Sequence, residues 1–114
     1  MMSDTIFDKI ISREIPAEII YEDELCLAFN DVNPQAPIHV LIIPKKPIAK
    51  VADANTNDQN LLGHLLLKAG EIAGQLNAND AFRLVINNGA EAGQTVFHLH
   101  IHLLAGRELN WPPG

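Results

Sequence analysis

The run "HLHIHLL" at residues 98–104 constrains the fold more than any other stretch, because histidine and apolar residues alternate along it. Successive side chains of a β-strand point to opposite faces, whereas a helix would spread the three histidines around its surface. The alternation therefore predicts a strand over residues 95–106, with one face made of histidines and the other turned into a hydrophobic core. The histidine face carries His98, His100 and His102, and the core face carries Leu99, Ile101 and Leu103.

The rest of the chain alternates between short helices and short strands. Apolar residues at helical spacing predict a helix at 6–11, capped by Ser3 or Asp4 and stopped by Pro16. Strand-like runs lie at 18–32, where the polar turn "EDE" divides two strands, and at 38–44 and 82–88. This order predicts an α+β domain, an antiparallel sheet with its helices against one side.

A polar connection at 45–58 leads into the clearest helix, for which Thr56 and Gln59 fit a capping box. His64 falls far from the centre of the helix's apolar stripe, so we expect it to be a plain surface residue. The stripe comprises Leu61, Leu62, Leu65, Leu66, Ala69, Ile72, Ala73 and Leu76.

Length and composition indicate one domain, residues 1–114, in which 47% of residues are hydrophobic. Eight basic and fourteen acidic residues give a formal charge of −6, which disfavours general binding to nucleic acid or to an anionic membrane. The N-terminus lacks the pattern of a signal peptide, and no run suits a membrane span. Cys26 cannot form an internal disulfide and is expected to be a buried apolar residue, so a cytoplasmic location is expected.

Three aligned histidines leave several interpretations open at this stage. They could hold zinc, although positions along one strand do not converge on a point and no cysteine or carboxylate lies near the run. They could be buried with their hydrogen bonds satisfied, or form a polar face washed by solvent. They could also perform acid–base and nucleophilic chemistry on phosphorus. The preceding "NNGAEAGQT" favours the last interpretation, since Gly89, Gly93 and Thr95 could cradle phosphate oxygens.

The motif "HLHIHLL" resembles the signature of the histidine triad (HIT) superfamily. The segments "IFDKIISREIP", "FNDVNPQAPIHVLIIPKK", "RLVINNG" and "GQTVFHLHIHLLAGRELNWPPG" look like its Hint branch, the purine nucleoside phosphoramidases. The resemblance implies a HIT fold: a five-stranded antiparallel sheet with two helices, joined across a homodimer into one ten-stranded sheet. It implies hydrolysis of adenosine or guanosine 5′-phosphoramidates through a nucleotidyl-histidine intermediate, with AMP or GMP released. Cleavage of dinucleoside polyphosphates is an alternative, as is a regulatory or scaffold role that needs only nucleotide binding.

Site roles carry over from the resemblance position by position. His100 matches the nucleophile, His102 the residue that contacts phosphate and assists the leaving group, and His98 and His39 a supporting pair. Without the resemblance, His39 would be read as a buried, satisfied histidine.

Substrate-binding positions carry over in the same way. Asp31, otherwise a turn residue before Pro34, matches the carboxylate that accepts the ribose hydroxyls. Asn87, Gly93, Thr95 and Val96 fall on the phosphate side, and Trp111 matches an aromatic that reaches the partner's site. The purine slot comprises Ile6, Phe7, Ile10, Phe29 and Val32.

Two positions depart from the family's patterns. Many Hint sequences have serine at the place of Thr95, so the extra methyl group could reduce the space for the leaving group. Some HIT proteins carry a Cys-x-x-Cys zinc pair where this chain has Thr5 and Asp8. We therefore expect neither a metal nor another cofactor.

Overall fold

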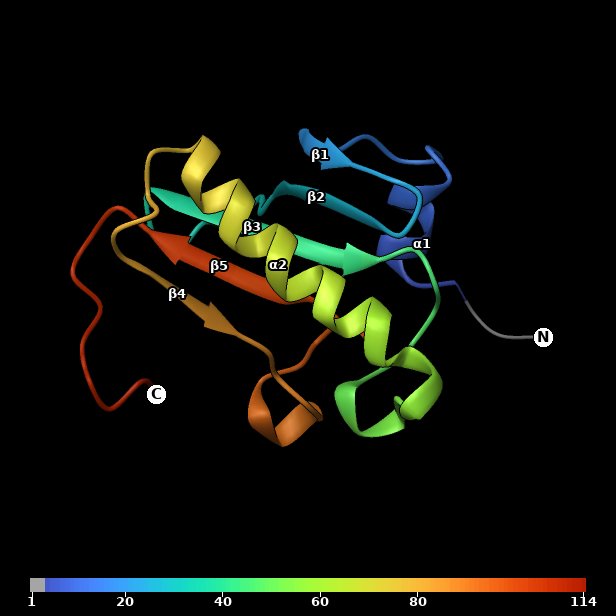
Figure 1. Cartoon of the computed structure of the whole chain (residues 1–114). Coiled ribbons are helices and arrows are strands. Elements are labelled where there is room, and N and C mark those ends of the chain that lie inside the picture. The colour runs from blue at the N-terminus through green and yellow to red at the C-terminus, as the bar shows by residue number, and fades with distance from the viewer. Residues whose placement is uncertain (1–3) are drawn as a thin grey trace.

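The sheet lies at the centre of the computed structural model, which describes residues 4–114 (Figure 1). Its five strands are antiparallel and run in the order β1-β2-β3-β5-β4. This arrangement confirms the predicted α+β class with five antiparallel strands and two helices. The elements are α1 (Ile6–Ile11), β1 (Ile19–Glu22), β2 (Cys26–Asn30), β3 (Ile38–Pro44), α2 (Gln59–Gln75), β4 (Phe82–Val85) and β5 (Ile101–Ala105).

The two helices cover opposite faces of the sheet, so the prediction that both lie against one side is wrong. One core cluster joins Leu65 of α2 to Ala28 and Val40, while another joins Phe7 of α1 to Leu27 and Leu41. The cause is visible in β2 and β3, whose apolar residues are continuous rather than alternating. Strands of this kind need cover on both sides.

The N-cap of helix α1 lies one residue after Asp4, the later of the two expected caps. Thr5 is the N-cap: its hydroxyl accepts the backbone N–H of Asp8, and the Asp8 carboxylate accepts the backbone N–H of Thr5. The expected cap at Asp4 is therefore wrong, and Ser3 lies outside the described residues. A capping box thus occupies the two positions, Thr5 and Asp8, that the family resemblance compares with a cysteine pair.

Helix α2 is preceded by two short 3-10 helices, Val51–Asp53 and Thr56–Asp58, in the polar connection at 45–58. The capping box there joins Asn55 to Asp58, so the predicted pair Thr56–Gln59 is wrong. Of the predicted stripe, Leu65, Ala69, Ile72 and Ala73 are buried, whereas Leu66 is 51% exposed. No helix in residues 4–114 is long and apolar enough to cross a membrane.

The histidine run is divided between two kinds of backbone. Regular pairing begins only at Ile101, so the predicted strand over the whole of 95–106 is wrong in its first half. Before that point the Leu99 amide donates to the carbonyl of Ile48 (2.7 Å), which lies beyond the end of β3. The inward and outward alternation nevertheless persists, because Leu99 and Ile101 join the core under α2.

Leu65→Ala tests the burial of α2. We expect a decrease of about 2–5 kcal/mol in the free energy of unfolding, because Leu65 is fully buried in the core and truncation leaves a cavity. Leu67→Ala on the same helix is the matched control, since Leu67 is 70% exposed and its loss should change stability by about 0.5 kcal/mol or less. Urea unfolding followed by circular dichroism measures both, and equal effects would contradict the burial of Leu65 against the sheet.

Candidate active site

A pocket of about 290 Å³ opens between α1 and the neighbouring strand ends. His100 and His102 line it together with Asp31, Thr95 and Val96. The remaining wall is mostly apolar and includes all five residues predicted for the purine slot: Ile6, Phe7, Ile10, Phe29 and Val32. Within residues 4–114 no lysine or arginine lines the pocket, so an anion there would depend on imidazole and backbone donors.

His100 is held in one tautomer by the backbone. Its Nδ1–H donates to the carbonyl oxygen of His98 at 2.7 Å, which leaves the lone pair on Nε2. The ring of Phe7 lies edge-on, 5.0 Å away between centroids, and fixes the orientation of the imidazole. Burial lowers the pKa of His100, against the opposing effects of the His98 carbonyl and of Asp31. A buried, neutral imidazole with a free Nε2 has the form required of a nucleophile.

His98 is buried behind His100 and does not line the pocket. Its Nε2–H donates to the carbonyl oxygen of Pro44 at 2.7 Å, at the end of β3. Its Nδ1 lies 3.4 Å from a carboxylate oxygen of Asp8, the residue that also caps α1. His98 therefore ties α1, β3 and the histidine run together, and its own carbonyl sets the tautomer of His100.

A second chain of hydrogen bonds fixes His39 and His102. The backbone N–H of Gln35 donates to His39 Nδ1 (3.0 Å), so the neutral ring of His39 carries its proton on Nε2. That Nε2–H faces His102 Nδ1 at 3.0 Å. His102 consequently carries its own proton on Nε2, where a ligand in the pocket can receive it.

Burial is the largest influence on the protonation of this pair. It lowers the pKa of His39, against the opposing charge of Asp31. The pKa of His102 falls to about 4 because burial is reinforced by His100 and His39. Both rings are therefore neutral near pH 7, as the hydrogen-bond chain requires.

Asp31 caps a turn and also borders the pocket. One carboxylate oxygen accepts the backbone N–H of Asn33 at 2.8 Å and so caps the turn. The other lies 3.4 Å from His39 Nε2 and borders the pocket. Asp31, His39 and His102 could offer a metal three ligand atoms within 4.8 Å of one another, but the facing nitrogens of the two histidines already bond each other.

The loop that contains Gly89 and Gly93 is held in place by the side chain of Gln94, a residue that no sequence pattern singled out. Gln94 is 2% exposed; its Oε1 accepts the Gly89 amide (2.8 Å), and its Nε2 donates to the carbonyls of Ala49 (2.8 Å) and Val96 (3.1 Å). Gly93 has a φ of 98°, a conformation that favours glycine. No sequence pattern indicates this role, because the partners of Gln94 are backbone groups and one of them, the Ala49 carbonyl, lies 45 residues away.

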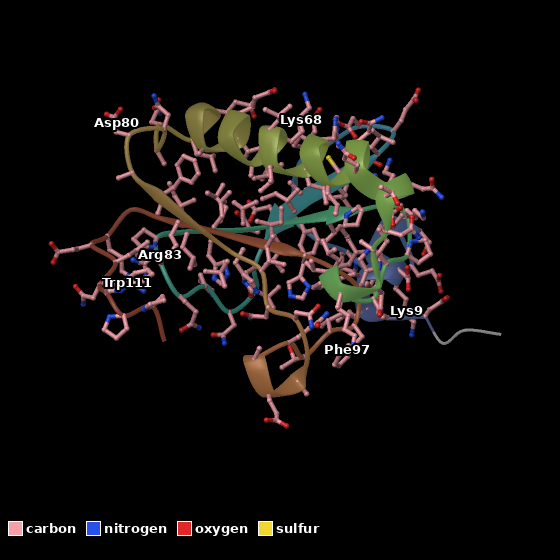
Figure 2. The ribbon with its side chains drawn as sticks, turned by 60° about the horizontal axis from the view of Figure 1, so that its bottom comes forward. Lys9, Lys68, Asp80, Arg83, Phe97 and Trp111 are labelled. Carbon is pink, nitrogen blue, oxygen red and sulfur yellow. The ribbon has the colours of Figure 1, made fainter. Side chains whose placement is uncertain are left out.

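Three predicted substrate residues, Asn87, Gly93 and Trp111, lie outside the pocket lining of this chain. Asn87 is adjacent to Gly93, since a Cβ atom added at Gly93 would lie 3.5 Å from the side-chain nitrogen of Asn87. Trp111 is 80% exposed, and the guanidinium of Arg83 lies 5.9 Å from its ring centre. Figure 2 shows Arg83 and Trp111 together, at the end of the molecule away from Lys9 and Phe97.

Known proteins resemble this chain over most or all of its length. An uncharacterised HIT-like protein of Synechocystis is 68% identical, with both chains fully covered. A 14 kDa zinc-binding protein of Zea mays is 52% identical over 98% of this chain and 89% of its own. A HIT family hydrolase from Legionella pneumophila superposes with a TM-score of 0.95 at 46% identity, covering 97% of this chain and all of the other.

A more distant structure, the histidine triad nucleotide-binding protein from Candida albicans, has a TM-score of 0.82 at 31% identity, covering 96% of this chain and 83% of the other. The HIT domain itself matches residues 12–109. With this match and relatives similar over their whole length, the chain belongs to the HIT domain family.

Proposed function

We propose that this protein is a hydrolase of purine nucleoside 5′-phosphoramidates, with His100 as the nucleophile. The observation that carries the proposal is the hydrogen bond from His100 Nδ1 to the His98 carbonyl, which leaves Nε2 ready to attack in the pocket. The Legionella structure is described as a hydrolase, which supports the proposed hydrolysis. The Candida structure is described as a nucleotide-binding protein, which supports the proposed nucleotide substrate.

In the first step, the lone pair of His100 Nε2 attacks the α-phosphorus while the P–N bond to the amine breaks. His102 donates its Nε2 proton to the departing amine, because its Nδ1 is already occupied by His39. The negative charge left on His102 is balanced by the positive charge that nucleotidylation places on the ring of His100, 4.9 Å away between centroids. In the second step, water gives a proton to His102 and attacks phosphorus, and His100 leaves. The products are the nucleoside monophosphate and the regenerated pair of histidines.

The rest of the pocket suits the nucleoside. Its apolar wall, which includes Phe7 and Phe29, offers a slot for a purine, and Asp31 offers an acceptor for ribose hydroxyls. We further propose a cytoplasmic homodimer in which Trp111 reaches the partner's site. That arrangement would give a role to a large aromatic side chain that this chain leaves exposed.

The proposed chemical steps use residues of this chain alone. The name of the maize relative concerns zinc, but the facing nitrogens of His39 and His102, which a metal in this pocket would need, already bond each other. A dinucleoside polyphosphate offers the same α-phosphorus to His100. Comparing its cleavage with that of adenosine phosphoramidate distinguishes the two substrate classes.

His100→Ala should abolish turnover of adenosine 5′-phosphoramidate, because His102, the other imidazole that lines the pocket, carries a proton on its Nε2. Rapid-quench intact-mass measurements should find a nucleotidyl adduct on the wild-type protein and none on the variant. Binding of AMP by calorimetry is the control for folding and should persist. Normal turnover by His100→Ala would overturn the nucleophile assignment.

The value of kcat/KM should stay constant from pH 8 to below pH 6.5, the ordinary pKa of histidine. Burial lowers the pKa values of His100 and His102, so both rings stay neutral in weak acid, and activity falls only as they become protonated. A pH–rate profile measures this directly. An acid limb with its midpoint above 6.5 would contradict the assigned protonation states.

Thr95→Ser should favour bulky amine leaving groups. Thr95 lines the pocket, and removing its methyl group keeps the hydroxyl while adding space. We expect kcat/KM to rise about two- to tenfold for a large aromatic amine. The unsubstituted phosphoramidate is the internal control, and an equal change for both substrates would argue against a steric role.

A further inference from the structure

A second cluster of reactive side chains lies on the opposite face of the sheet from the histidine pocket. Asp23 begins the turn between β1 and β2, Cys26 is the first residue of β2, and His64 belongs to α2. A carboxylate oxygen, the thiol sulfur and a ring nitrogen of these residues all lie within 4.8 Å of one another. The sequence patterns predict only a buried apolar residue at Cys26 and a surface residue at His64.

His64 is not a plain surface residue. Its side chain is 26% exposed, and its Nε2 lies 2.7 Å from an oxygen of Asp23. The expectation that it simply faces solvent is therefore wrong, and the cause is a contact between residues 41 positions apart. Cys26 is fully buried, as expected.

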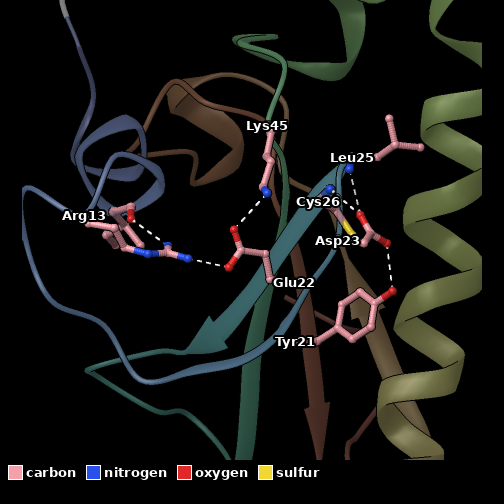
Figure 3. Close-up of polar contacts among 8 residues, drawn as sticks. Arg13, Tyr21, Glu22, Asp23, Leu25, Cys26 and Lys45 are labelled. Atoms are coloured by element: carbon pink, nitrogen blue, oxygen red, sulfur yellow. Dashed lines mark hydrogen bonds and ion pairs between the residues drawn. The ribbon is translucent and has the colours of Figure 1, made fainter.

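Asp23 is fixed in position and ionised. One oxygen accepts the backbone N–H groups of Leu25 and Cys26, both at 2.8 Å, while the other accepts the hydroxyl of Tyr21 (Figure 3). That second oxygen also lies 2.7 Å from His64 Nε2. Burial alone would raise the pKa of Asp23, but these hydrogen bonds outweigh it and hold the pKa well below its usual range. A negative oxygen therefore faces the ring of His64.

Cys26 is a protonated thiol as long as no cation is near. Burial, reinforced by the charge of Asp23, raises its pKa to about 12. Coordination to a divalent metal reverses this preference, because metal-bound thiols lose their proton. One positive ion would thus relieve the repulsion between a thiolate and the carboxylate of Asp23.

We propose that Asp23, Cys26 and His64 form a zinc-binding site that fastens the β1–β2 turn to α2. One sulfur, one nitrogen and one oxygen suit zinc better than calcium or magnesium, which prefer oxygen alone. Asp23 and His64 are partly exposed, so water can complete the tetrahedron from the solvent side.

The ion requires only a small local adjustment. The distance between Asp23 and His64 must open from 2.7 Å to about 3.3 Å, the edge of a tetrahedron with bonds of about 2.0 Å to nitrogen and oxygen. Tyr21 can keep its hydrogen bond to Asp23, since a carboxylate oxygen accepts more than one partner. Lys68 lies over the Tyr21 ring and adds one positive charge nearby, partly offset by Glu71 at 3.1 Å.

This site is independent of the proposed reaction. Along β2, Cys26 and Ala28 face α2, whereas Leu27 and Phe29 face α1 and the pocket. A zinc ion here would stabilise the fold without contacting His100 or His102. Its affinity should rise with pH, because binding releases the proton of Cys26.

Titration of the full-length protein with Co²⁺ tests the proposal. One equivalent should bind and produce a thiolate-to-cobalt charge-transfer band, and Zn²⁺ should displace it. Cys26→Ser should lose the band. His64→Asn, at a partly exposed position, should weaken Zn²⁺ binding on the order of tenfold to a hundredfold, measured by competition with a chromophoric chelator.

His102→Asn is the matched control, because it disrupts the other group of possible ligands while leaving this one intact. It should bind Co²⁺ as tightly as the wild type, with the same band. Absence of the thiolate band in the wild type would overturn the proposal. The proposal would also be overturned if Co²⁺ binding were lost in His102→Asn and retained in His64→Asn. That comparison does not depend on whether Cys26→Ser folds.

Discussion

The pairing of β3 with β5 is the constraint on which the rest of the site depends. β3 lies between β2 and β5, and its register with β5 sets Leu41 opposite His102. Because side chains alternate between faces, this register also puts His39 on the same face as His102, within hydrogen-bond distance. A slip of one residue would turn His102 toward α2 and separate the pair.

Much of this architecture follows from local patterns in the sequence. The run 38–44 coincides with β3 as observed, and the alternation of histidine with apolar residues correctly assigned Leu99, Ile101 and Leu103 to the core. Period-2 and period-3.6 patterns report which side chains are buried, because each follows directly from the geometry of a strand or a helix. Ten of the predicted site residues line one pocket.

The features that could not be predicted involve partners far away along the chain. Regular β5 pairing starts late because Leu99 bonds Ile48 beyond the end of β3. Gln94 and His64 carry no local signal because their contacts, with Ala49 and Asp23, come from other elements. The predicted caps were also misplaced: Thr5 rather than Asp4 caps α1, and the capping box before α2 joins Asn55 to Asp58 around the short 3-10 helix Thr56–Asp58. Neighbouring polar residues compete for the same role, and only the backbone geometry decides between them.

The tautomers of the histidines have a consequence for how the site can change during evolution. Main-chain groups set them: the carbonyls of Pro44 and His98 and the amide of Gln35. These groups are present whatever side chain occupies the position. Substitutions at positions 35 and 44 can therefore alter packing while the same hydrogen bonds persist, provided the backbone keeps its course and an amide hydrogen remains at position 35. The backbone conformation therefore maintains the tautomers in the pocket, and the side chains that must be retained are the imidazoles themselves.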